Sequence, residues 1–383
     1  QFGASELESS QNDILNGTDD SLMKQNWLDA LADKPKQGAN VEVTIDPALQ
    51  QAAYDQLVGP GYEGSAVAIQ PSTGKILAMA SNPGYNPNDL MGDSAEDVWA
   101  NLQEQEGQPL VNHAGAETLP PGSIFKIITT AAGLNNGFDP SSTLTGSNVI
   151  TLPDTVTELT NYANQKCNGQ DAVTLQTAFA LSCNTAFVEM SEQLGADELR
   201  KYAKAFGVGE NYDLGVSTSA GTLGDLPDGA ATAQSAIGQR DVTMTALQAA
   251  VMAGTVANKG TRMQPYLVNR ITDAQMKDIR TTKPKKADQA VNEETAATLT
   301  DLMYASERSS AGYDGNGFAS KTGTAEHGEG LAPHVWYVAF DPERDIAVGV
   351  VVKNGGNLGE SATGGKVSGP IGRAILRAYQ GEQ

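Results

Sequence analysis

The chain has 383 residues, of which 39% are hydrophobic, and its formal net charge at pH 7 is −21. This composition excludes intrinsic disorder, because enough apolar side chains are present to build a large core. The negative charge argues against nucleic acid or an anionic membrane surface as a partner, because its long-range field would repel both.

The first 38 residues are polar and weakly periodic, and they end in Lys34-Pro35-Lys36-Gln37-Gly38, a composition typical of a linker. We expect residues 1–38 to be a polar linker, the remnant of an N-terminal non-catalytic region, and residues 39–383 to form the folded domain. The sequence starts at Gln1 with no signal peptide and no apolar run of the about 18 residues that a membrane span requires. We therefore interpret it as a processed piece, whose anchor would have preceded Gln1.

Strand and helix signals begin directly after this stretch. Alternating apolar residues over 41–45 predict a strand, and Asp46-Pro47 predicts the N-cap and first residue of a helix that ends near Val58. Two short apolar runs, 64–70 and 75–81, are joined by a tight-turn composition of Pro, Ser, Thr and Gly. They predict an antiparallel hairpin.

Helical periods separated by Gly and Asn follow, and strand signals return near the C-terminus. We expect a mainly helical subdomain at about 113–258, with helices at 124–135, 174–194 and 243–258. Three strands and a last helix are expected at 318–324, 335–340, 346–352 and 370–379. The order predicts an α+β fold in which an antiparallel sheet with flanking helices carries an all-helical subdomain.

The chain contains three histidines, and none lies in a metal-binding pattern such as His-Glu-x-x-His. We interpret His327 and His334 as loop or second-layer histidines, and we expect neither a metal site nor a cofactor. An obvious histidine-based triad is therefore missing, and a nucleophilic enzyme with this sequence would need another base.

The Ser-x-x-Lys pattern supplies such a base, because residues i and i+3 share a helix face. It occurs at Ser21, Ser72 and Ser123. The first match lies in the polar N-terminal stretch and the second crosses the predicted hairpin turn, so we interpret both as chance. Ser123-Ile124-Phe125-Lys126 instead follows Pro120-Pro121-Gly122 and begins a predicted helix, whose partial positive charge favours a developing oxyanion. Taken alone, this serine is either a nucleophile or a helix cap.

Two further motifs accompany it: Ser182-Cys183-Asn184 in the helical block and Lys321-Thr322-Gly323-Thr324 on a predicted strand. The three motifs together resemble the signature of penicillin-binding proteins and serine β-lactamases. The stretches 64–79, 237–239 and 321–327 also resemble a transpeptidase domain, and the resemblance covers about residues 38–383. The chain is most similar to the small class B penicillin-binding proteins of actinobacteria that are linked to cell division.

This resemblance implies a penicillin-binding-protein/serine β-lactamase-like transpeptidase fold and a set of roles. Ser123 would be the nucleophile, a neutral Lys126 would take its proton, and Ser182 would relay that proton to the leaving amine. The amide hydrogens of Ser123 and Thr324 would form the oxyanion hole. The residues expected to bind substrate are Asn184, Lys321, Thr322, Gly323 and Thr324.

The implied reaction is that of a peptidoglycan D,D-transpeptidase, which cross-links stem peptides ending in D-Ala-D-Ala through a serine acyl-enzyme and is inhibited by β-lactam antibiotics. The resemblance further implies septal or polar cell-wall synthesis, with a membrane glycosyltransferase and division proteins as partners and no nucleic acid. The location would be the extracytoplasmic face of the cell membrane, with an N-terminal transmembrane helix absent from this chain as anchor.

Three other functions are compatible with the same residues. A serine β-lactamase would need the glutamate of a Glu-x-x-Leu-Asn loop for deacylation, and this pentapeptide does not occur in the chain. A penicillin-sensing receptor domain and a D,D-carboxypeptidase could share every residue named above.

The two cysteines, Cys167 and Cys183, are 16 residues apart. In an exported protein we expect them to form a disulfide rather than remain two buried thiols. Because Cys183 lies inside Ser-x-Asn, the disulfide would also hold that loop in place.

Overall fold

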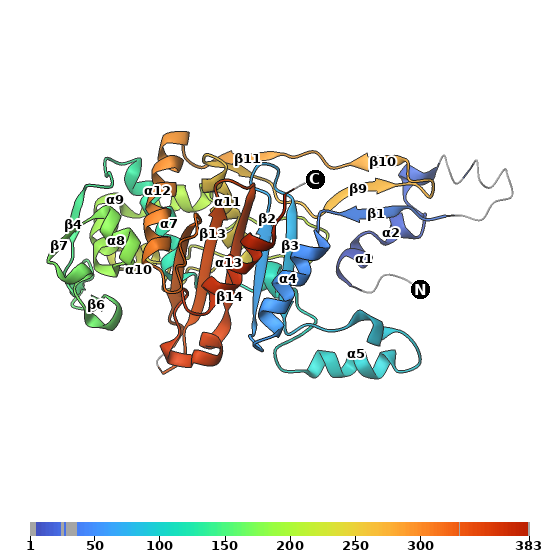
Figure 1. Ribbon diagram of the computed structural model, residues 1–383, viewed down its shortest axis with the longest axis horizontal. Helices are drawn as coiled ribbons and strands as arrows, with labels where there is room; N and C mark the ends of the chain where they lie inside the picture. The colour runs from blue at the N-terminus through green and yellow to red at the C-terminus, as the bar shows by residue number, and fades with distance from the viewer. Residues whose placement is uncertain (1–4, 24–26, 28–36, 329, 382–383) are drawn as a thin grey trace.

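The computed structural model describes residues 5–23, 27, 37–328 and 330–381. Its centre is a five-stranded antiparallel sheet with the strand order β12-β13-β14-β2-β3, so that β12 lies at an edge (Figure 1). The predicted hairpin and all three C-terminal strands are confirmed. The strands are β2 (Gly64–Ile69), β3 (Ile76–Asn82), β12 (Ala319–Ala325), β13 (His334–Asp341) and β14 (Ile346–Val352).

Helices cover both faces of this sheet. One face packs against α4 (Pro47–Val58) and α13 (Ser368–Ala378), and the other packs against α11 (Ala246–Ala257). The α4 prediction is confirmed together with its cap, because the Asp46 carboxylate accepts hydrogen bonds from two amides of the first turn at 2.8 and 3.0 Å. Burial of these three helices turns the sheet into the middle layer of the domain.

Each face of the sheet has its own hydrophobic cluster. The larger cluster lies between the sheet, α11 and the helical subdomain, and the smaller lies between the sheet, α4 and α13. Neighbouring side chains of a strand point to opposite faces. Along β13, Trp336 and Val338 therefore join the larger cluster, whereas Tyr337 joins the smaller one.

The helical subdomain carries α6 (His113–Ala116), α7 (Lys126–Leu134), α8 (Leu175–Leu181), α9 (Asn184–Ala205) and α10 (Gly229–Ala236). Two predictions need correction here. The subdomain is not all-helical, since it contains two short antiparallel pairs, β4 (Thr143–Thr145) with β7 (Ala172–Thr174) and β5 (Val149–Thr151) with β6 (Glu158–Thr160). The helix expected over 174–194 is broken, because Ser182 has left-handed backbone angles (φ 61°, ψ 40°) that end α8.

The N-terminal segment lies at the opposite end of the molecule from the helical subdomain (Figure 1). We expected a linker there, and the described part contains short helices that pack: Ile14 and Leu22 are buried against Ile271. The strand predicted over 41–45 is present and joins a three-stranded sheet. The elements are α1 (Glu6–Ser10), α2 (Asn12–Leu15), η1 (Asp20–Leu22), β1 (Asn40–Val43), β9 (Val268–Thr272) and β10 (Asp278–Thr281).

The remaining elements connect these parts. They are η2 (Pro87–Leu90), α5 (Ala95–Glu104), η3 (Gly122–Phe125), η4 (Tyr162–Asn164), η5 (Cys167–Gly169), β8 (Thr261–Met263), β11 (Lys286–Gln289), α12 (Glu293–Ser309) and η6 (Lys353–Ser361). Within the described residues, none of the helices has the length and apolar character needed to cross a membrane.

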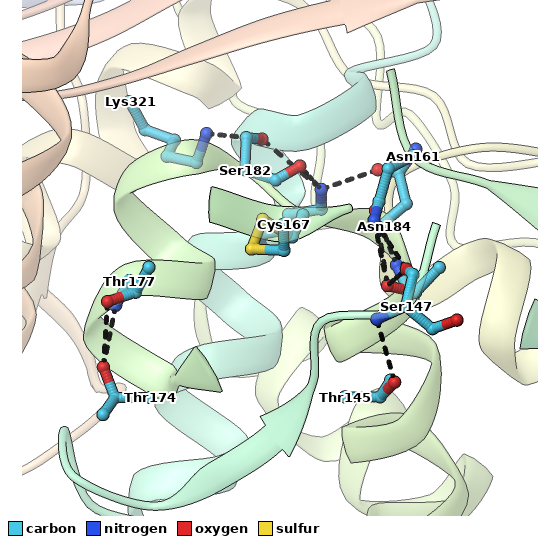
Figure 2. Close-up of a disulfide and its surroundings, with 12 residues drawn as sticks. Thr145, Ser147, Asn161, Cys167, Thr174, Thr177, Ser182, Asn184 and Lys321 are labelled. Atoms are coloured by element: carbon cyan, nitrogen blue, oxygen red, sulfur yellow. Dashed lines mark hydrogen bonds between the residues drawn. A yellow bond between two sulfur atoms is a disulfide. The ribbon is translucent and has the colours of Figure 1, made fainter. Parts of the chain in front are cut away.

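A disulfide joins Cys167 to Cys183, with a Cα–Cα distance of 5.7 Å (Figure 2). Both cysteines are buried, at 3% and 5% exposed. The bridge connects η5 to the two residues that separate α8 from α9. It therefore restrains the chain at the point where the helical path is interrupted.

The disulfide predicts two measurable properties. Thiol titration of the denatured, unreduced protein should find no free thiol, and two reactive thiols would contradict the bridge. Reduction should lower the free energy of unfolding by about 3 kcal/mol, because the unfolded chain gains entropy when the bridge opens and a sequence separation of 16 residues gives a gain of this size. Denaturant unfolding with and without reductant measures the difference.

Candidate active site

Ser123 lies in the short helix η3, which continues directly into α7. The helix start predicted at this serine is therefore confirmed, and its side chain is half-buried. The preceding residue, Gly122, has a φ of +54°, and a Cβ at this position would lie 2.8 Å from the carbonyl oxygen of Thr324. Only glycine allows so close an approach, and it brings the Ser123 turn against β12.

Lys126 begins α7 and is completely buried. Its Nζ donates hydrogen bonds to the Ser182 carbonyl oxygen at 2.8 Å and to Asn184 Oδ1 at 2.7 Å, and it lies 3.4 Å from Ser182 Oγ. Burial lowers the pKa of Lys126 well below its ordinary value, and repulsion from Lys321 lowers it further. A neutral amine has two N–H groups and one lone pair. In the neutral form, the two short contacts use both N–H groups and leave the lone pair to accept a proton.

Lys321 approaches the same serine from the sheet. Its Nζ donates to Ser182 Oγ at 2.8 Å and to the Thr322 carbonyl oxygen at 3.0 Å (Figure 2). The side chain is completely buried, and this burial lowers the pKa of Lys321 to about 7. Ser182 Oγ thus lies between two lysine amines, which connects the Ser-x-x-Lys and Lys-Thr-Gly motifs through Ser-x-Asn.

The break between α8 and α9 positions the Ser182 and Asn184 side chains. Asn184 Nδ2 donates to the carbonyl oxygen of Thr160 at 3.1 Å, while its Oδ1 accepts from Lys126. Asn161 accepts a hydrogen bond from the Thr185 amide at 3.1 Å and so fixes the first turn of α9 to the β6 strand end. We did not identify Thr160 or Asn161 from the sequence, because neither belongs to a motif and an asparagine in a loop carries no distinctive signal.

The motif on β12 lies beside the Ser123 turn. A Cβ on Gly323 would come within 2.7 Å of the Pro121 carbonyl oxygen, so glycine is needed for this contact. The Trp336 indole on the neighbouring strand donates to the Pro120 carbonyl oxygen at 2.8 Å and ties the same turn to the sheet. Thr322 and Thr324 are half-buried on this edge strand. All residues of the three motifs are therefore gathered in one place.

The other candidates do not join this centre. Ser72 lies on the β2–β3 hairpin turn and its hydroxyl donates to Asp345, while Ser21 is in η1 and the lysine of its motif, Lys24, lies outside the described residues. His327 and His334 stack with ring centroids 3.8 Å apart. In the described part of the chain, no group of His, Cys, Asp and Glu side chains is arranged to hold a metal ion.

Comparisons with known proteins match both parts of the chain. The family described as the penicillin binding protein transpeptidase domain matches residues 64–377, and the penicillin binding protein A dimerisation domain matches residues 1–41. Peptidoglycan D,D-transpeptidase PbpA of Mycolicibacterium smegmatis is 43% identical over 98% of this chain and 80% of its own length. The corresponding PbpA of Mycobacterium tuberculosis is 41% identical over all of this chain and 81% of its own length.

Solved structures agree with the sequence matches. Penicillin-binding protein A from M. tuberculosis, as its ceftriaxone acyl-enzyme complex, superposes with a TM-score of 0.94 and 41% identity, covering 98% of this chain and 87% of that chain. The D,D-transpeptidase domain of an Eggerthella lenta peptidoglycan glycosyltransferase superposes with a TM-score of 0.82 and 27% identity, covering 99% of this chain and 87% of that chain. The fold expected from the resemblance is confirmed. With its three motifs joined around Ser182 and a family match over most of its length, the chain belongs to the class B penicillin-binding proteins.

Proposed function

We propose that this chain is a peptidoglycan D,D-transpeptidase in which Ser123 forms the acyl-enzyme. Ser123 Oγ attacks the carbonyl carbon between the two D-Ala residues of a stem peptide, and the terminal D-Ala leaves as a free amine. An amine of a neighbouring stem peptide then attacks the ester and releases the cross-linked product. The observation that carries the proposal is the convergence of two buried lysines on Ser182, next to the turn that holds Ser123.

Lys126 is the group that takes the proton from Ser123. It follows Ser123 by three residues, so the two side chains share one side of the first helical turn. Its lowered pKa favours the neutral amine, and the two N–H groups of that form are held by Ser182 and Asn184. The lone pair is then the part of the amine left to act as a base.

Ser182 delivers that proton to the leaving amine. Its hydroxyl lies 3.4 Å from the Lys126 amine and 2.8 Å from the Lys321 amine. If Lys321 is protonated it can only donate, so Ser182 Oγ accepts from Lys321 and its own hydrogen stays available for transfer. The proton thus passes from Ser123 to Lys126 and then through Ser182 to the nitrogen of the departing D-Ala.

The amides of Ser123 and Thr324 form the oxyanion hole, since the contact between Gly122 and Thr324 brings these two backbone segments together. Lys321, Thr322 and Thr324 bind the terminal carboxylate of the substrate. The Asn184 amide nitrogen has two hydrogens, of which one goes to Thr160. The second donates to the side-chain amide oxygen of the substrate, while Gly323 leaves room for the stem peptide to approach β12.

We further propose an extracytoplasmic location at the cell membrane, with a membrane glycosyltransferase and division proteins as partners. The buried disulfide supports an oxidising compartment. The substrate chemistry supports the same side of the membrane, because stem peptides are cross-linked outside the cytoplasm.

Intact-mass spectrometry with a penicillin, followed over hours, tests the proposed reaction. A transpeptidase should keep a one-to-one adduct, whereas rapid loss of the adduct would identify a β-lactamase. Incubation with a stem-peptide donor and an amine acceptor distinguishes a transpeptidase from a D,D-carboxypeptidase. Transfer to the amine supports the proposal, and release of D-Ala with water as the only acceptor would identify a carboxypeptidase.

Ser123→Ala should abolish the penicillin adduct, because Ser123 is the proposed nucleophile and the proposed base, Lys126, follows it by three residues at the start of α7. Ser72→Ala provides the matched control, since Ser72 also begins a Ser-x-x-Lys sequence but lies on a hairpin turn. This control should be labelled like the unmodified protein. An adduct on Ser72 or Ser182 in peptide mapping would refute the assignment of the nucleophile.

Lys126→Arg should reduce the acylation rate by about 10²- to 10⁴-fold, because a guanidinium keeps its proton and cannot act as the base. In the unmodified enzyme, acylation should increase with pH as Lys126 loses its proton, with a midpoint well below the ordinary lysine pKa of about 10.4. Stopped-flow measurement of acylation across pH gives this midpoint. A midpoint near 10 would exclude Lys126 as a base with a lowered pKa.

Lys321 should produce a second transition in the pH profile of acylation, in which the efficiency decreases as pH rises. The ammonium form binds the substrate carboxylate, so acylation efficiency should fall as pH rises through about 7, the pKa of Lys321. Lys321→Ala should remove this decrease and move the rising transition to higher pH, because Lys126 loses a repulsive neighbour. If the variant changes only the amplitude of the profile, the two lysines are not coupled.

A further inference from the structure

A buried charged cluster lies directly behind the strand that carries Lys321. Its centre is Glu307, near the end of α12, with a side chain that is 1% exposed. The carboxylate accepts hydrogen bonds from Arg373 Nε at 2.7 Å, from Tyr337 Oη at 2.9 Å, from Asn316 Nδ2 at 3.0 Å and from Ser320 Oγ. These four bonds use the acceptor capacity of the carboxylate.

The four donors come from four different parts of the chain. Ser320 is on β12, Tyr337 on β13, Arg373 on α13, and Asn316 in the loop that leads into β12. Glu307 adds a fifth part, α12, which runs along the edge of the sheet that carries β12 (Figure 1). The cluster therefore ties β12 to β13, α12, α13 and the loop that precedes β12.

Stability alone does not account for such a cluster. Burying an ion pair carries a large desolvation cost, and an apolar group of similar size is often at least as stabilising. Arg373 and Glu307 are 2% and 1% exposed, and their bonds extend to the Ala311 carbonyl and to Ser310. What a fully satisfied polar cluster provides, and an apolar one does not, is a defined geometry.

β12 depends on this geometry more than the inner strands do. As an edge strand it is bonded to β13 alone and has no second strand to hold it. Ser320 and Lys321 are neighbours on β12, so their side chains point to opposite faces. Ser320 reaches back to Glu307 while Lys321 reaches forward to Ser182 Oγ at 2.8 Å.

We propose that Glu307, acting through Ser320, is a positioning residue that sets where Lys321 Nζ meets Ser182. Glu307 does not touch substrate. It acts through its hydrogen bond to Ser320, the residue that precedes Lys321 on β12. A shift of β12 by about 1 Å would break the bond between Lys321 and Ser182, and misplacement of that size can cost about 100-fold in rate. This inference rests on the proposed function, because Lys321 and Ser182 matter here only as parts of the acylation site.

Ser320→Ala is the primary test, because it removes one hydrogen bond and leaves the Glu307–Arg373 ion pair intact. We expect the efficiency of acylation by a penicillin to fall between about tenfold and about 100-fold. The rising transition of the pH profile should also move to higher pH, because Lys321 no longer lies close enough to lower the pKa of Lys126. Glu307→Gln should produce the same two changes, with a larger loss of thermal stability because Arg373 is left without a counter-charge.

Ser191→Ala is the matched control. Ser191 is 2% exposed, and among the described residues its hydroxyl bonds only to the Val188 carbonyl within α9, so the variant loses an equally buried hydrogen bond away from β12. It should lower the melting temperature without changing the acylation efficiency or its pH profile. Ser320→Ala behaving in the same way would overturn the proposal.

A double-mutant cycle separates positioning from general destabilisation. In a Lys321→Ala background, Ser320→Ala should change acylation by less than about twofold, since its effect passes through Lys321. If Ser320→Ala and Lys321→Ala instead reduce the acylation rate by independent factors that multiply, the inference is overturned. Failure of the proposed function would look different, because the unmodified protein would then form no adduct on Ser123, lose the adduct rapidly, or use water as its only acceptor.

Discussion

Two lysine side chains without carboxylate partners, buried within one hydrogen-bonded centre, are the constraint on which the rest of the structure depends. Among the described residues, neither Lys126 nor Lys321 forms an ion pair. Burial of an ammonium without a counter-charge is unfavourable, and the group responds by giving up its proton more readily. The large cluster between the sheet and the helical subdomain must offset that cost. The same burial that costs stability lowers the pKa of Lys126 and so favours the neutral amine that the proposed reaction needs.

The polar contacts of this centre come from a place where regular structure stops. Ser182 ends α8 in a left-handed conformation, which turns its carbonyl oxygen and hydroxyl toward the lysines, and Asn184 starts α9 two residues later. A continuous helix would keep that carbonyl bonded within its own turns. The disulfide at Cys183 and the contacts to Thr160 and Asn161 hold the break in place from two sides. Function here depends on an interruption that packing and a covalent bond together maintain.

Periodicity and motifs predicted most of the sheet and the residues of the centre, while features that depend on distant partners were not visible in the sequence. The strand over 346–352 was predicted with its observed bounds, because an unbroken apolar run of that length fits a buried strand. The break at Ser182 was missed because apolar periodicity continues on both sides of it. Glu307 was missed for a different reason. A lone glutamate on a helix is typical of a solvated face, and its partner Arg373 is 66 residues away in the sequence.

The two faces of β12 suit the substrate-binding role that we propose for this edge strand. A free edge offers unpaired backbone groups to a substrate, but the same edge is the least restrained part of a sheet. A second strand on that side would hold β12 firmly and would also block the substrate. The chain instead restrains β12 from behind, where Ser320 joins a buried cluster that includes α12, α13 and β13. The forward face keeps Lys321 at Ser182, and among the described residues no second strand pairs with β12. The bond from Ser320 to Glu307 and the bond from Lys321 to Ser182 thus use opposite faces of the same seven residues.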